Sequence, residues 1–280
     1  MTHLLTVSTM IFIDEKPVAA LRSLYEAGVD FAELNYENIK RSEADYASII
    51  AEYRWALLEA TRLGISVPVV HAPYETYFLP SLGKGVKQLI REGLTLLDLF
   101  SSYGAEYIVF HPFGSEHVGA GRVWWLNKAF FSVLADYASS IGVKILVENT
   151  LDTKPWSSVT SLVKLVREIG SKSLKVCLDT GHAIINEQDP AKLVEEYHED
   201  IGGLHISDNN GKSDDHLLPG TGVIDWVEFR KAVLKAENLA CVMEVKCSCL
   251  KGENCRSRAY VARLIGGWIT GEIKSLHLVL

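Results

Sequence analysis

The sequence predicts an α/β fold of the (β/α)8, or TIM, barrel class. Seven short apolar runs each end in an acid or a histidine, namely Glu33, His71, His111, Glu148, Asp179, His205 and Glu244. Successive members are 38, 40, 37, 31, 26 and 39 residues apart, each about the length of a strand, a helix and two loops. A glycine also separates most helical stretches from the next apolar run, as expected where helices end.

The first half of the chain accommodates four strand and helix units. Pro17 opens the first helical stretch, where its missing N–H costs nothing, and Gly28 ends it. In the second helical stretch, apolar residues between Tyr46 and Leu58 recur at helical spacing. We expect strands at 3–9, 30–35, 65–71 and 105–111, and helices at 17–27, 42–63, 84–103 and 122–141.

The second half repeats the pattern. The runs KILVE, KVCLD, GGLH and ACVME are typical of buried parallel strands, which need helical crossovers between them. We expect strands at 144–149, 175–179, 202–207 and 239–245, and helices at 158–169, 190–198, 225–236 and 260–268. The stretch 180–190 is expected to be a loop.

One domain spanning residues 1–280 accounts for the whole chain, because a barrel of this class needs about 250 residues. No apolar run approaches the roughly 20 residues of a membrane span, and the N-terminal residues lack the pattern of a cleavable leader. We therefore expect a cytoplasmic protein with no membrane partner. The net charge of −7 disfavours nucleic acid as a partner, and a homo-oligomer is compatible with the sequence.

Three cysteines, Cys247, Cys249 and Cys255, gather near the C-terminus. Their C-x-C-x5-C spacing differs from the paired C-x2-C of zinc ribbons. The odd total of five cysteines argues against the disulfide framework of a secreted protein. We favour ordinary thiols or a redox-sensitive pair over a structural zinc.

Polar residues at the ends of four consecutive predicted strands indicate a metal site. The carboxyl ends of all barrel strands face one mouth, so Glu148, Asp179, His205 and Glu244 should converge there. Three carboxylates around one mouth repel each other unless a cation or protons neutralise them. The alternative is that lysines or backbone N–H groups satisfy each acid separately. Such ligands suit Mn²⁺, Mg²⁺, Co²⁺ or Zn²⁺.

Further candidate ligands are present. They are His71, His111, His182, Asp214 and His216. A single residue of this kind is more often structural, but together they could hold a second and a third cation.

The motifs HAPY, HPFG, VENT, CLDTGH, HISDNNGKSDDHLLPGTGVIDW and MEV resemble the xylose isomerase-like TIM barrel superfamily, which includes sugar and sugar phosphate isomerases and epimerases and endonuclease IV. The isomerase and epimerase members imply one divalent ion on Glu148, Asp179, His205 and Glu244, with His182 near the substrate. The endonuclease IV members imply three zinc ions and nine ligands. The nine ligands would be the four residues of the single-ion site, together with His182, His71, His111, Asp214 and His216.

We expect a divalent-metal-dependent isomerase or epimerase of a small sugar, sugar phosphate or polyol ketone that works through an enediolate. Glu148 and Glu244 would be its acid and base, and His182 would bind a substrate oxygen. The other predicted substrate contacts are Glu33, His71, Tyr74 and Trp124. The alternative is an endonuclease IV-like enzyme that cleaves abasic DNA with three zinc ions. A non-enzymatic sugar-binding protein is the third hypothesis.

Overall fold

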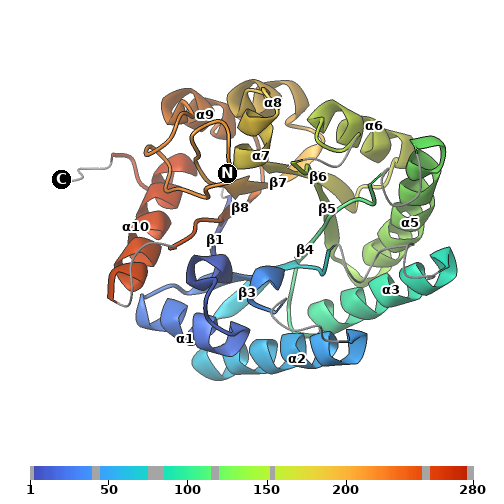
Figure 1. Ribbon diagram of the computed structural model, residues 1–280, viewed down its shortest axis with the longest axis horizontal. Coiled ribbons are helices and arrows are strands. Elements are labelled where there is room, and N and C mark those ends of the chain that lie inside the picture. The colour runs from blue at the N-terminus through green and yellow to red at the C-terminus, as the bar shows by residue number, and fades with distance from the viewer. Residues whose placement is uncertain are drawn as a thin grey trace.

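The computed structural model describes residues 3–39, 45–74, 85–114, 120–151, 155–247 and 253–275. Within them, eight parallel strands close into a barrel in the order of the sequence, as predicted (Figure 1). The first and last strands meet in register, with Leu4 opposite Ala240 and Val7 opposite Met243. The strands are β1 (Leu4–Ser8), β2 (Phe31–Leu34), β3 (Ser66–His71), β4 (Tyr107–Phe110), β5 (Lys144–Glu148), β6 (Leu174–Asp179), β7 (Ile201–Ile206) and β8 (Ala240–Met243).

Helices surround this barrel (Figure 1). They are α1 (Pro17–Glu26), α2 (Tyr46–Leu63), α3 (Val86–Ser102), α5 (Ala120–Ile141), α6 (Val159–Ile169), α7 (Thr180–Ile185), α8 (Pro190–Tyr197), α9 (Trp226–Val233) and α10 (Glu253–Ile269), with 3-10 turns η1 (Thr9–Phe12) and η2 (Tyr36–Asn38). Four α-helices begin at an aspartate whose carboxylate accepts one or two backbone N–H groups of the first turn, namely Asp45, Asp179, Asp189 and Asp225. In the described part of the chain, no helix has the length and apolar character needed to cross a membrane.

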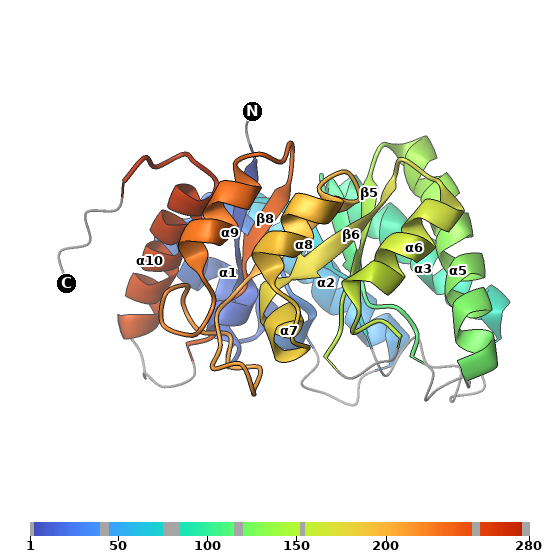
Figure 2. The same cartoon turned by 90° about the horizontal axis from the view of Figure 1, so that it is seen from above.

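Two helices differ from the sequence prediction. The stretch 180–190 was expected to be a loop, but its first half forms α7. Asp179 starts this helix by accepting the backbone N–H of His182 at 2.7 Å. The final helix, expected at 260–268, begins earlier, at Glu253. In Figure 2, α7 lies at the end of the barrel opposite the N-terminus, which is the end where the strands finish.

An apolar layer fills the barrel interior below this end. It consists of the buried side chains Val69, Val109, Leu146, Cys177, Ala240 and Val242. Gly203 belongs to the same region, and a Cβ there would lie 2.5 Å from Leu146 Cδ1, so only glycine fits without displacement. Side chains alternate along a strand. The residues two positions after Val69, Leu146 and Cys177 are His71, Glu148 and Asp179, so these also point into the barrel, one layer closer to the mouth.

Candidate metal centre at the barrel mouth

The structure brings together the four predicted ligands from β5 to β8. His205 Nδ1 lies 3.1 Å from Glu148 Oε1 and 3.2 Å from Glu244 Oε2. One ligand atom from each of Glu148, Asp179, His205 and Glu244 lies within 4.8 Å of the others, and all four residues are buried. Among the described residues, the ion-pair contacts of these buried carboxylates are with histidines and not with lysines or arginines. Protons or a cation therefore have to balance their negative charge.

A second group shares Glu148. Its other carboxylate oxygen, Oε2, lies 3.0 Å from His71 Nε2 and 3.2 Å from His111 Nε2. The ligand atoms of these three residues also lie within 4.8 Å of one another. Each Glu148 oxygen therefore faces a different set of imidazoles.

The remaining predicted ligands gather around Asp214, in the loop between β7 and α9. Asp214 Oδ2 lies 2.8 Å from His216 Nε2 and 3.9 Å from His182 Nε2. The buried Asp208 organises this loop, because its carboxylate accepts the backbone N–H groups of Gly220 and Gly222 at 3.0 and 2.8 Å. All nine predicted ligand residues thus lie in one connected cluster at the barrel mouth.

The orientations of three histidines fit metal coordination. His71, His182 and His216 each place Nδ1 2.8–3.0 Å from a backbone carbonyl oxygen, those of Ala72, Asn149 and Glu244 respectively. A carbonyl only accepts, so Nδ1 carries the proton and Nε2 of the neutral ring has a lone pair. That lone pair faces a carboxylate in each case. Two acceptors that face each other need a second ring proton or a cation between them.

In the metal-free protein, these charges perturb several pKa values. Burial raises the pKa of Asp179 to about 7, and the carboxylates of Glu148 and Glu244 add to this against the opposing His182. Burial tends to lower the pKa of His182, but Asp179 and Asp214 outweigh it and raise the value to about 10. Protons would therefore occupy part of the cluster when no cation does.

Buried atoms without partners give a second indication of a cation. Among the residues that the structure describes, two buried carboxylate oxygens of the predicted ligands make no hydrogen bond, Asp179 Oδ2 and Asp214 Oδ1. Buried polar groups are rarely left unsatisfied, and such clusters indicate an ion or water. The donor set of carboxylates and imidazoles suits a divalent cation of the Mn²⁺ or Zn²⁺ type. The residues therefore fit the metal that the sequence implied.

Of the predicted substrate contacts, Tyr74 lies at the barrel mouth and Trp124 does not. Tyr74 is at the mouth, stacked on His111 with ring centroids 4.5 Å apart, and its hydroxyl donates to Glu37. Trp124 lies in the helical layer, stacked on Trp156 at 5.5 Å, and its Nε1 donates to Glu168 of α6 at 3.1 Å. The substrate-binding role of Trp124 stays a prediction that this packing does not support.

Sequence reasoning missed three buried residues that hold the cluster in place. Asn149 pairs with the backbone of Asp179 through both ends of its amide, at 2.8 and 3.1 Å. Asn35 donates to Glu33 and Glu244, and Asp208 holds the loop that carries Asp214. Asn149 directly follows Glu148, Asn35 lies two residues after Glu33, and Asp208 lies three residues after His205, and this proximity in sequence was the available signal.

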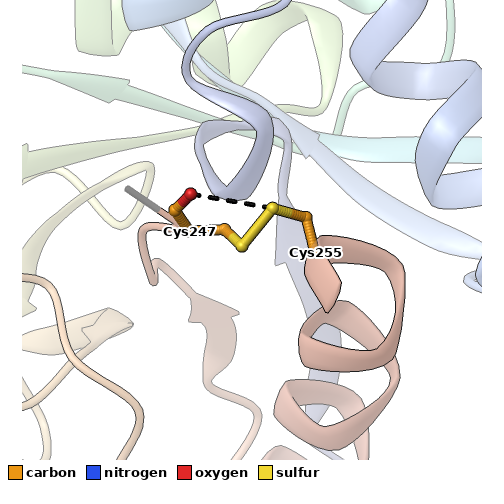
Figure 3. Close-up of a disulfide and its surroundings, with 2 residues drawn as sticks. All are labelled: Cys247 and Cys255. Carbon is orange, nitrogen blue, oxygen red and sulfur yellow. Dashed lines mark hydrogen bonds between the residues drawn. A yellow bond between two sulfur atoms is a disulfide. The ribbon is translucent and has the colours of Figure 1, made fainter. Parts of the chain in front are cut away.

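The C-terminal cysteines form a pair close to this site. Cys247, three residues after Glu244, is joined by a disulfide to Cys255 at the start of α10 (Figure 3). The expectation of a redox-sensitive pair is compatible with this bond, whereas ordinary free thiols at these two positions are contradicted by it. Cys249 lies outside the described residues.

Comparisons with known proteins identify relatives. Residues 21–264 match the profile of the family described as "Xylose isomerase-like TIM barrel". An uncharacterized protein of Methanocaldococcus jannaschii is 28% identical over 79% of this chain and 76% of its own length. A probable endonuclease 4 of Mycoplasma mobile is 26% identical over 63% of this chain and 67% of its own. The crystal structure of D-psicose 3-epimerase from Clostridium cellulolyticum H10 superposes with a TM-score of 0.75 at 16% identity, covering 96% of this chain and 99% of that one.

Proposed function

Because the chain belongs to the xylose isomerase-like TIM barrel family, we propose that it is a divalent-metal-dependent isomerase or epimerase of a small sugar, sugar phosphate or polyol ketone. The single observation that carries this proposal is the pair of buried carboxylates, Glu148 and Glu244, which meet at His205 Nδ1 within one four-residue ligand group. Sugar epimerases among the structural neighbours support it.

A divalent cation held by the four-residue group would polarise a ketose carbonyl and stabilise the negative charge that develops on its oxygen. Glu148 and Glu244 come from strands three places apart in the ring. In the proposed reaction, one carboxylate removes the proton from the carbon next to the carbonyl, and the other returns a proton to the substrate. In the metal-free protein, burial opposes ionisation of Glu244, but His205 outweighs it and lowers the pKa of this carboxyl to about 2.

Deuterium exchange tests this proposal without knowledge of the product. The Mn²⁺-loaded protein would be incubated in D₂O with D-psicose, D-tagatose, D-fructose and ketose phosphates, and carbon-bound deuterium measured by NMR. We expect exchange next to the carbonyl of at least one ketose, lost in Glu244→Gln. Glu92→Gln is the matched control, because Glu92 is a buried glutamate of α3, bound by Gln88 outside the cluster. A lack of exchange across the panel would contradict the proposal.

Endonuclease IV-like cleavage of abasic DNA is the second candidate. One observation favours it, namely that Glu148 belongs to two ligand groups while His182, Asp214 and His216 form a third set. Against it stands the net charge of −7, which offers no general attraction to phosphates. Elemental analysis separates the candidates, because one ion per chain supports the isomerase and three zinc ions support the nuclease. Metal-dependent nicking of an abasic duplex would establish the second candidate.

A further inference from the structure

The buried carboxylate of Glu33 faces the outer nitrogen of a metal-site histidine. We propose that Glu33 is a positioning residue that orients His205 for metal binding and does not touch the substrate. The inference rests on the proposed metal-dependent function. The sequence predicted Glu33 as a substrate contact, but it is fully buried, with 0% of its surface exposed. Its Oε1 lies 3.2 Å from His205 Nε2.

His205 differs from the other histidines of the cluster in which nitrogen faces inward. His71, His182 and His216 hold Nδ1 against a backbone carbonyl and turn Nε2 to the carboxylates. In His205 the arrangement is reversed, with Nδ1 3.1 and 3.2 Å from the carboxylates of Glu148 and Glu244. Its Nε2 therefore needs an acceptor of its own, so that the proton stays there and Nδ1 keeps its lone pair for the cation.

Glu33 is suited to be that acceptor. The 3.2 Å distance is that of a hydrogen bond. Within the described ranges, neither Glu33 Oε1 nor His205 Nε2 makes a hydrogen bond of good angular geometry. A change of angle alone would complete the bond between them. It would satisfy two buried atoms at once and would give His205 Nε2 the acceptor that a backbone carbonyl provides for Nδ1 of His71, His182 and His216.

Asn35 fixes the Glu33 carboxylate and links it to the proposed base. The Asn35 amide nitrogen donates to Glu33 Oε2 at 3.2 Å and to Glu244 Oε1 at 2.8 Å. The carbonyl end of the same amide accepts the backbone N–H of Glu37 at 2.9 Å, which sets the orientation of the amide. One buried amide from the segment after β2 thus connects the group behind His205 to Glu244, so the two ligands are held by a common element.

Loss of such a hydrogen-bond partner behind a metal-binding histidine usually weakens metal binding by 10- to 100-fold. The experiment measures Mn²⁺ affinity of the metal-free full-length protein by the EPR signal of free Mn²⁺. We expect Glu33→Gln to raise the dissociation constant by about 10- to 100-fold. Glu92→Gln, the same chemical change at a buried glutamate outside the cluster, should leave it unchanged.

A second measurement needs no variant. In the Zn²⁺-loaded wild-type protein, long-range ¹H–¹⁵N imidazole spectra should show His205 with its proton on Nε2 and Nδ1 coordinated. The opposite tautomer would overturn the proposal, even if Glu33→Gln failed to fold. An unchanged dissociation constant in Glu33→Gln overturns the positioning role alone, and the proposed function then stands. A wild-type protein that binds no divalent cation overturns both.

Discussion

Asp179→Asn should stabilise the metal-free protein at neutral pH while it removes a ligand of the proposed metal site. Burial raises the pKa of Asp179 from 3.8 to about 7. A shift of about three pKa units corresponds to about 4 kcal/mol of unfavourable free energy for the ionised carboxylate in the folded state. Asparagine removes the charge and keeps the oxygen that accepts the His182 backbone N–H, so the start of α7 is preserved.

The sign of the pH dependence follows from the direction of the shift. The pKa of Asp179 is higher in the folded state than in the unfolded state. The folded protein therefore keeps its full stability with respect to this group below about pH 4, where the carboxyl is protonated, and loses about 4 kcal/mol as the pH rises through about 7. The advantage of the variant should therefore be small near pH 4 and grow to about 4 kcal/mol at pH 8.

Urea unfolding in the presence of EDTA, at several pH values between 4.5 and 8, measures this difference directly. Added Mn²⁺ is the control, because it should stabilise the wild type and leave Asp179→Asn unaffected. A variant that is less stable than the wild type in EDTA at pH 8, or a difference that does not vary with pH, would refute the reasoning.

Three further predictions concern the same barrel. Glu244→Gln should reduce turnover at least about 1,000-fold with an unchanged circular dichroism spectrum, because it removes the proposed base, and near-normal turnover would exclude that role. Chelation should lower the midpoint of thermal unfolding, and Mn²⁺ at about 100 times its dissociation constant should raise the free energy of unfolding by about 2.7 kcal/mol. A midpoint that changes with neither treatment would argue against a resident ion. Gly203→Ala should cost about 1–3 kcal/mol, because its Cβ would meet Leu146 Cδ1 at 2.5 Å, whereas Gly121→Ala, with open space around its Cβ, should be nearly neutral in the same denaturation assay.

The sequence predicted the barrel and the gathering of its ligands because both depend on local signals. An apolar run that ends in a polar residue marks the carboxyl end of a strand, and barrel closure brings all such ends to one mouth. His71, Glu148 and Asp179 could therefore be placed together without knowledge of any contact.

The features that the sequence did not reveal depend on particular side-chain contacts. Nothing in the local pattern separates Glu33, which faces His205, from a glutamate that faces substrate. The sequence does not predict α7 because only six residues form it, and its start depends on the side chain of Asp179, whose sequence pattern indicates only a ligand. The pairing of Cys247 with Cys255 likewise depends on where α10 begins.

The apolar layer inside the barrel has a consequence for the order of events at the mouth. Val69, Val109 and Leu146, with their neighbours, form an apolar floor directly below the ligand atoms. This floor leaves the mouth of the barrel as the side from which an ion would approach Asp179 and His205, and a substrate would come from the same side. A substrate that covered the ion would have to bind after it. Bound substrate should therefore slow the loss of the metal to a chelator.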